Sequence, residues 1–278
     1  MIKRPAVAAA ETVDRNKKLE TFARFGYVVN GLFHALIGIS AIGIVIGQGG
    51  EVDQSGVLKP MTTTIWGMLF VLLIALGLIA LSFWKVMQIL ISTKLQRKGL
   101  RRYAFEEGVK ALAYVVLGVS TLILLFSHSA QDSSARSSRQ LVANLYGIPL
   151  GPLLVLLLGI GCMAIGVSLI YKGVRRRFMR ILDGPPEKLE PLVIVLGTVG
   201  YISKGLILLS LGVIFGFTFF ARDPSRVSGL DGAFRDFLSL PFGGIVIVAL
   251  GVGFIFYALF SITRAKIGHI RIKTHKYI

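Results

Sequence analysis

Three polar residues inside long apolar segments are the groups of this sequence most able to do chemistry. Lys204 lies well inside one such segment, and Asn30 and Lys110 occupy the corresponding place in two others. Charged side chains are costly in hydrocarbon, so those that occur there often mark a ligand or ion site. With His34 and Tyr114 one helical turn further on, we expect a polar ring that could receive an anion or an anionic lipid headgroup.

A purely structural role for these residues is the competing interpretation. The amines of Lys110 and Lys204 can extend to the cytoplasmic membrane surface, and Asn30 can bond a neighbouring carbonyl. His34 has no second His or carboxylate at metal-ligand spacing, which favours a hydrogen-bonded packing residue over a proton shuttle or metal ligand. The one cysteine, Cys162, lies in an apolar segment and is expected to be a buried or lipid-facing residue.

The sequence lacks the motifs of common catalytic and cofactor sites. It contains no G-x-S-x-G, H-E-x-x-H, C-x-x-C or P-loop pattern. No carboxylate lies deep in an apolar segment, which weakens the case for a proton- or sodium-coupled carrier. We therefore expect no catalytic residue, no metal site and no cofactor, and a protein that is not an enzyme.

Six apolar segments are long enough to cross a bilayer as helices. Apolar residues make up 54% of the 278-residue chain and charged residues 16%, whereas soluble domains carry about 25% charged residues. A spanning helix needs about 20 mostly apolar residues. The predicted spans cover residues 22–46, 65–91, 104–126, 148–171, 192–220 and 238–262.

The distribution of Lys and Arg predicts the orientation of the spans. The N-terminal segment, the second and fourth loops and the C-terminal tail hold 22 of the 31 basic residues, and the other three loops hold six. Because basic loops stay in the cytoplasm, we expect a multi-pass plasma-membrane protein with both termini cytoplasmic. The net charge of +17 then indicates attraction to anionic lipid headgroups rather than nucleic-acid binding.

A two-helix unit recurs three times along the chain. The pattern G-Y-x-x-[N/K]-G-x6-G begins at Gly26 and again at Gly200, and a weaker copy follows Glu106. The second spans share a P-x-G start, at Pro149 and Pro241, and each outer loop contains a short one-sided apolar segment. The repeats are residues 22–91, 104–173 and 192–264, between a cytoplasmic segment 1–21 and a basic tail 265–278.

This repetition predicts an all-α membrane fold of three parallel two-helix repeats. Two spans return the chain to its starting side, so the repeats point the same way and are expected to surround a pseudo-threefold axis. The short outer segments are expected to lie as interfacial helices on the outer membrane surface. Small residues on one stripe of the first spans predict close helix packing, with hinges as the alternative. They are Gly31, Gly38, Gly118, Gly205 and Gly212.

These motifs resemble those of a bacterial membrane family described as domain of unknown function 1206. The resemblance rests on the G-Y-x-x-[basic]-G helix, the acid-then-glycine outer loop at Asp53 and Asp231, and the P-F-G start at Pro241. It covers about residues 22–264 and implies three tandem two-helix repeats. Asn30, in place of a basic residue, and the acidic start of the third span depart from the family pattern. The resemblance implies no established activity.

Two functions remain open from the sequence. The glycine stripes, the short loops and the missing catalytic groups favour a non-enzymatic structural or accessory protein. Such a protein would bind membrane lipids, partner membrane proteins or further copies of itself. Lys204, Lys110 and Asn30 instead favour a channel or carrier for a small anionic solute. A water-accessible cavity at these three residues would favour transport, and a closed axis would favour a structural role.

Overall fold

The computed structural model describes residues 17–48, 50–94, 100–126, 134–182, 187–223 and 229–268. In these ranges the chain forms helices and turns, with one isolated antiparallel bridge between Leu182 and Gly268. Six of the described helices are long and apolar enough to cross a membrane. They are α2 (Lys17–Val45), α4 (Ile65–Lys94), α5 (Leu100–Phe126), α7 (Gly151–Val174), α8 (Glu190–Ala221) and α10 (Gly243–Ile267).

This architecture confirms the expected fold class, and the chain is a multi-pass helical membrane protein. Shorter helices connect the spans within each repeat. The described ones are α3 (Gln54–Leu58) with η1 (Lys59–Thr63), α6 (Ser134–Tyr146) and α9 (Gly229–Leu238). One more short helix, η2 (Arg177–Ile181), follows α7 at the opposite end of the bundle. Its Phe178 is buried and stacks on the ring of Tyr201 in α8.

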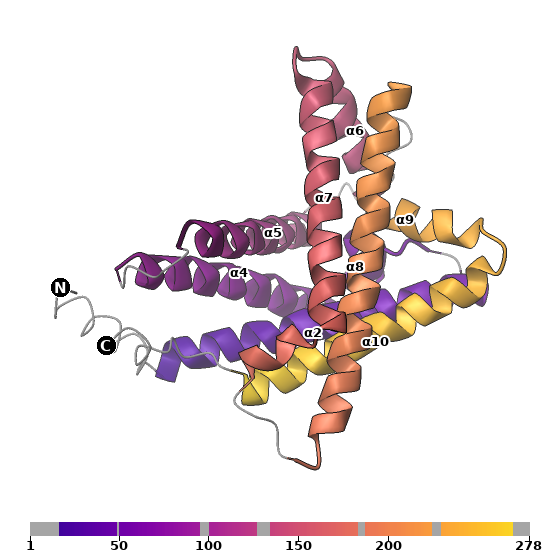
Figure 1. Cartoon of the computed structure of the whole chain (residues 1–278). Coiled ribbons are helices and arrows are strands. Elements are labelled where there is room, and N and C mark those ends of the chain that lie inside the picture. Colours follow the sequence, from indigo (N-terminus) through magenta and orange to yellow (C-terminus); the bar gives the residue numbers. More distant parts are fainter. Residues whose placement is uncertain are drawn as a thin grey trace.

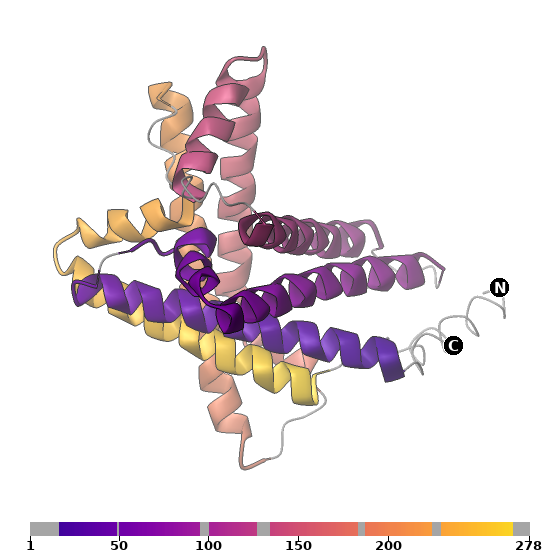
Figure 2. The ribbon, with the colours of Figure 1, turned by 180° about the vertical axis from the view of Figure 1, so that it is seen from behind.

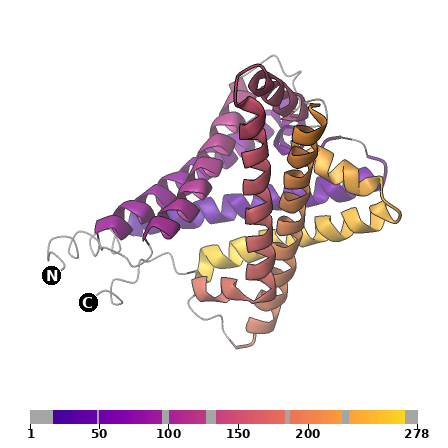
Figure 3. The same ribbon diagram turned by 45° about the horizontal axis from the view of Figure 1, so that its top comes forward.

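The long helices pack as three antiparallel pairs, and each pair joins two different repeats. α4 packs on α5, α7 on α8, and α10 on α2, so the second span of one repeat lies beside the first span of the next. Figure 1 shows the α7–α8 pair crossing the α2–α10 pair, and Figure 2 shows α4 and α5 side by side from behind. The three pairs run in different directions (Figure 3). The first span therefore pairs with the last, and each repeat contacts both of the others.

Small residues set the closest approach of the helices within each pair. A Cβ atom added to Gly38 on α2 would lie 2.5 Å from the carbonyl oxygen of Gly251 on α10. A side chain at this point would push the two helices apart, so the small residues allow the contact. The corresponding contacts in the other two pairs are Gly212 with Gly159 and Gly118 with Ala75.

A second set of small residues lies seven positions away in each pair. In the α4–α5 pair, Ser82 Oγ donates a 2.8 Å hydrogen bond to the carbonyl oxygen of Ala111. The same seven-residue spacing on both helices of all three pairs means that the three interfaces are structurally equivalent. The corresponding contacts are Gly31 with Ala258 and Gly205 with Gly166.

Contacts between the two spans of one repeat are made twice rather than three times. α2 packs on α4, and α8 packs on α10. Among the described residues, α5 and α7 have no comparable contact. The three repeats are therefore present, but the packing departs from a regular threefold arrangement between α5 and α7.

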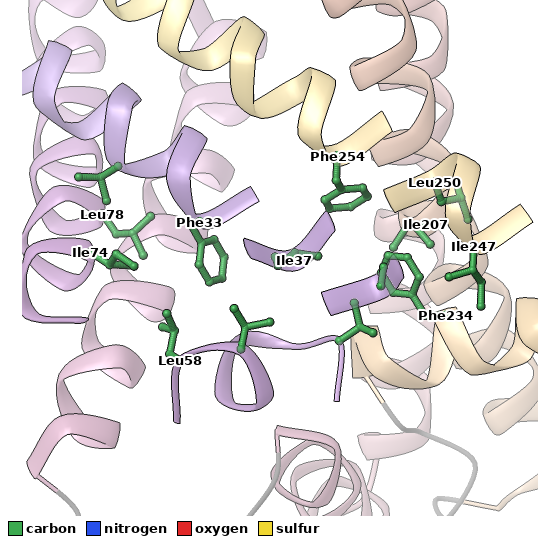
Figure 4. Packing of buried hydrophobic residues seen from close by; sticks show 14 of the residues in the cluster. Phe33, Ile37, Leu58, Ile74, Leu78, Ile207, Phe234, Ile247, Leu250 and Phe254 are labelled. Carbon is green, nitrogen blue, oxygen red and sulfur yellow. The ribbon is translucent and has the colours of Figure 1, made fainter. Parts of the chain in front are cut away.

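The main apolar core lies at the end of the bundle where α3 and α9 connect the spans. Leu58 of α3 and Phe234 of α9 are buried among residues of the spans, including Ile74, Ile247 and Phe254 (Figure 4). We expected the short helices to rest on the membrane surface. α3 and α9 bury their apolar faces against the spans, and their place at the outer membrane surface stays a prediction.

The P-x-G sequence makes the turn from a short helix into the following span. Leu150 and Phe242 precede α7 and α10 in the left-handed conformation, with φ of 66° and 61°. Gly151 and Gly243 come next, each so close to a carbonyl of the preceding segment that a Cβ atom would collide with it. Only glycine can follow such a turn without moving the backbone.

Candidate functional site

A hydrogen bond joins Lys204 on α8 to His34 on α2. The lysine Nζ lies 2.9 Å from His34 Nε2, and His34 Nδ1 lies 2.7 Å from the carbonyl oxygen of Asn30. A carbonyl only accepts hydrogen bonds, so Nδ1 carries the proton and Nε2 accepts from the lysine amine. His34 is therefore a neutral imidazole that positions the Lys204 amine.

Aromatic rings of α10 enclose this contact. Lys204 Nζ lies 4.4 Å from the ring centroid of Tyr257, and the His34 imidazole lies 4.7 Å from the same centroid and 5.8 Å from that of Phe254. Cation–π attraction of about 0.5–2 kcal/mol stabilises an amine in this position. It does not neutralise the charge, and no carboxylate among the described residues contacts Lys204.

The Asn30 side chain faces α10 rather than Lys204. Its Nδ2 donates to Ser261 Oγ at 3.1 Å, and the Ser261 hydroxyl donates to the carbonyl oxygen of Tyr27 at 2.8 Å. Asn30 is linked to Lys204 only through its own carbonyl and His34. Its amide serves to hold α2 against α10.

Lys110 belongs to a second group of charges, on α4 and α5. Glu107 lies 2.7 Å from the amine of Lys85 and 2.5 Å from the amine of Lys110. Lys85 and Glu107 are buried, whereas Lys110 is partly exposed. The Lys85–Glu107 pair ties α4 to α5 inside the bundle, and Lys110 extends it towards the surface.

Arg264, near the end of α10, connects the two groups. The centre of its guanidinium lies 4.2 Å from the ring centroid of Tyr27 on α2, and the Lys85 amine lies 5.9 Å from the same centroid. Both charged groups therefore share one aromatic ring. Two further tyrosines lie beside these rings: Tyr201 of α8 packs on Tyr257, and Tyr114 of α5 packs against the apolar cluster that contains Tyr27.

We call the resulting set the cation cluster: Lys85, Lys110, Lys204, Arg264, Glu107, Tyr27, Tyr114, Tyr201 and Tyr257. It contains four basic side chains and one carboxylate, which Lys85 and Lys110 share. Among the described residues, neither Lys204 nor Arg264 contacts a carboxylate. Those residues also contain no group of three His, Cys, Asp or Glu able to hold a metal ion. The chemistry that this arrangement offers is anion binding.

The residues expected to form one polar ring are distributed through the cation cluster. Lys204 and Asn30 both contact His34, while Lys110 lies with Glu107 in the second group. Tyr114 is half-buried and packs against the apolar residues of the core. The predicted ring residues therefore do not meet at a single point.

Six members of the cluster were not identified from the sequence as site residues: Lys85, Arg264, Glu107, Tyr27, Tyr201 and Tyr257. Lys85 reads as an anchor at the membrane surface, and Glu107 as a residue at the edge of its span. The sequence did carry a signal that Glu107 is an internal residue. In the alignment of the repeats it occupies the position of Tyr27 and Tyr201, which lie on the inward-facing side of the first span of their repeats. An inward position removes a carboxylate from the surface and requires a basic partner.

The fold and the cluster together define a helical membrane protein of three two-helix repeats with an internal set of cations. The chain belongs to the family described as Domain of Unknown Function (DUF1206), which matches residues 25–88, 108–176 and 199–268. These three segments coincide with the three repeats. They confirm the resemblance found in the glycine and P-x-G motifs.

One similar protein is the uncharacterized protein YxxB of Bacillus subtilis (strain 168). It is 27% identical over 256 residues, which make up 90% of this chain and 92% of the relative. The similarity therefore extends over all three repeats. No solved structure matches the chain.

Proposed function

We propose that this protein is a non-enzymatic structural or accessory protein of the cytoplasmic membrane that binds anionic lipid headgroups through the cation cluster. In this proposal both termini face the cytoplasm, as the basic loops predict. Partner membrane proteins or further copies of the chain would pack on the lipid-facing sides of the spans.

The unbalanced charge of the cation cluster carries the proposal. Lys204 and Arg264 contact aromatic rings and an imidazole, none of which supplies a negative charge. Both side chains are half-buried, and a charge that is partly removed from water without a counter-charge is destabilised. A bound phosphate would supply that counter-charge and accept hydrogen bonds from the guanidinium, which is well suited to oxyanions.

The position of the cations along the spans favours a lipid phosphate. Arg264 lies three residues before the end of α10, and Lys110 lies in the first half of α5. Both side chains are long enough to reach the headgroup level at that end of the bundle. Anionic headgroups attract each nearby basic residue by about 1 kcal/mol.

Native mass spectrometry of gently solubilised protein tests this proposal. Wild type is expected to retain phosphatidylglycerol or cardiolipin, and Arg264→Gln to lose most of that bound lipid. Arg180→Gln is the control, because Arg180 is an exposed basic residue at the same end of the bundle. Equal retention of anionic lipid by the two variants would overturn the assignment of the cluster as the headgroup site.

A small-anion carrier is the second candidate, and the position of the Lys204–His34 contact supports it. Both residues lie near the middle of their helices, far from either end of the spans. A lysine at that depth is within reach of a solute that crosses the bilayer. Chloride or phosphate flux into proteoliposomes, lost in Lys204→Gln, would support transport, and the absence of flux in wild type would exclude it for these anions.

The proposed orientation has its own test in cysteine labelling. Because Cys162 is the one native cysteine, a Cys162→Ser background leaves a single introduced thiol to detect. Arg180→Cys should react with a membrane-impermeant maleimide only after the cells are permeabilised. Thr63→Cys, in the connection between the first two spans, should react in intact cells. The reverse pattern would refute the orientation.

A further inference from the structure

The second repeat leaves uncovered a face that the other two repeats bury. Leu158 on α7 is 50% exposed, whereas the corresponding residues Ile74 on α4 and Leu250 on α10 are 1% and 4% exposed. Two helical turns further along α7, Ile165 is 38% exposed, whereas Leu81 at the corresponding position of α4 is fully buried. The difference follows from the missing contact between α5 and α7.

A glycine on this face shows how open it is. Gly77 on α4 lies so close to Val29 that a Cβ atom would come 2.5 Å from its side chain. Gly253 on α10 is still closer to the side chain of Ser203. Gly161 occupies the same place in α7, and nothing lies within 4 Å of a Cβ atom built there. In the second repeat the glycine borders space instead of a helix.

The opposite side of this space, on α5, is also shaped differently. Ala113 stands where the first repeat has Phe33, which is buried in the core. Glu106 stands where the first and third repeats have the close-packing glycines Gly26 and Gly200. A carboxylate at this point prevents the two helices from packing as they do elsewhere. We call the space bordered by Glu106, Ala113, Leu158, Gly161 and Ile165 the open seam.

Basic residues lie at one end of the open seam. Lys172 on α7 lies 3.7 Å from Glu106 across the seam, and Lys110 lies one turn from Glu106 on α5. Lys172 is paired with Glu106 and Lys110 with Glu107, but the two lysine side chains are 32% and 41% exposed. Each ammonium has three N–H donors, so these pairs leave donors for a further anion. Lys110 is also a member of the cation cluster, so the seam opens beside that cluster.

We propose that the open seam binds one anionic phospholipid. An acyl chain lies between α5 and α7 along Leu158, Gly161 and Ile165, and the phosphate binds the amines of Lys110 and Lys172. This inference rests on the proposed lipid-binding function and specifies where the acyl chain lies. The combination of an apolar seam with cations at the headgroup end matches the chemistry of an anionic phospholipid. A protein helix is a poorer match, because Glu106 occupies the point where a close-packing small residue is needed.

The first experiment fills the seam. Gly161→Trp directs an indole into this space, since a Cβ atom at Gly161 has nothing within 4 Å. The variant is expected to unfold at the same temperature as wild type, which circular dichroism checks. Gly216→Trp on α8 is the matched control, because a Cβ atom there also has nothing within 4 Å. Native mass spectrometry with added phosphatidylglycerol should show loss of the bound lipid in Gly161→Trp and full binding in the control.

The second experiment uses the unchanged protein. Cys162 is the neighbour of Gly161 and is partly exposed, so its alkylation by a maleimide reports on access to the seam. Phosphatidylglycerol at ten times its Kd leaves about one site in eleven empty, so alkylation should slow about tenfold. Phosphatidylethanolamine at the same concentration should leave the rate unchanged.

Three results would overturn this inference. One is equal lipid binding by Gly161→Trp and Gly216→Trp, and another is a Cys162 alkylation rate that phosphatidylglycerol does not change. The third is a dimer of wild type that Gly161→Trp dissociates, which would make a second copy of the chain the occupant. Each of these can occur while Arg264→Gln still loses lipid, so failure of the seam and failure of the proposed function are distinguishable.

Discussion

Replacement of Glu107 by Gln should destabilise the protein far more than the same change at its neighbour Glu106. Among the described residues, Glu107 is the carboxylate that pairs with the buried Lys85, with the amine 2.7 Å away and only 4% and 10% of the two side chains exposed. Glu106 lies 3.7 Å from Lys172, with 40% and 32% of the side chains exposed. The two substitutions are chemically identical and differ in burial and pairing.

The expected magnitudes follow from that difference. Removal of one partner from a buried ion pair costs about 3–5 kcal/mol, because the other charge stays buried and unpaired. Exposed pairs contribute about 0–1 kcal/mol. Glu107→Gln should therefore lower the free energy of unfolding by about 3–5 kcal/mol, and Glu106→Gln by less than about 1 kcal/mol. Lys110 adds little to the first value, because its exposed side chain can turn to solvent.

Unfolding in mixed micelles by increasing fractions of sodium dodecyl sulfate, followed by circular dichroism, measures both values. The double variant Lys85→Met/Glu107→Met should recover most of the lost stability, since well-packed apolar residues can replace a buried pair at little cost. Two results would refute the reasoning. Either the two Glu→Gln variants unfold within about 1 kcal/mol of each other, or the double variant is no more stable than Glu107→Gln alone.

Three further substitutions test the packing, in the same unfolding assay. Gly38→Leu should lower the free energy of unfolding by about 1–3 kcal/mol, because the leucine Cβ would lie 2.5 Å from the carbonyl oxygen of Gly251. Gly216→Leu is the control and should have little effect, because a Cβ atom there has nothing within 4 Å. Equal losses of stability in the two variants would contradict the packing role of Gly38. Phe178→Ala should cost about 3–5 kcal/mol, since the ring is buried against α8 and α10; a loss below about 1 kcal/mol would show that the ring is not packed there in the membrane. Asp53→Ala should cost about 1 kcal/mol by removing the 2.8 Å cap on the Gly56 amide, and unchanged stability would argue against the cap.

The spans and repeats could be predicted from the sequence because hydropathy and glycine spacing are local patterns. The pairing of helices could not. The stripe that contains Gly38 predicts close packing against some helix, but both spans of a repeat carry small residues, and the pattern does not say which surfaces meet. Gly38 packs on Gly251, from the opposite end of the chain, and not on a span of its own repeat.

The candidate site was predictable only in part, for a related reason. Lys204 and His34 stand out because each interrupts an apolar segment, and they prove to be in contact. Lys85 does not stand out, because a lysine near the end of a span usually reaches the membrane surface. It is buried because α5 brings Glu107 against α4, and that pairing depends on tertiary contacts.

The pairing of α2 with α10 has a consequence for the order of assembly. The first helix to enter the membrane packs on the last, so its glycine face stays in lipid until synthesis of the chain is nearly finished. The other two inter-repeat pairs join helices adjacent in sequence, and they can form while translation continues. A chain truncated before α10 would therefore retain two of the three pairs and expose Gly31 and Gly38 to the quality-control proteases of the membrane.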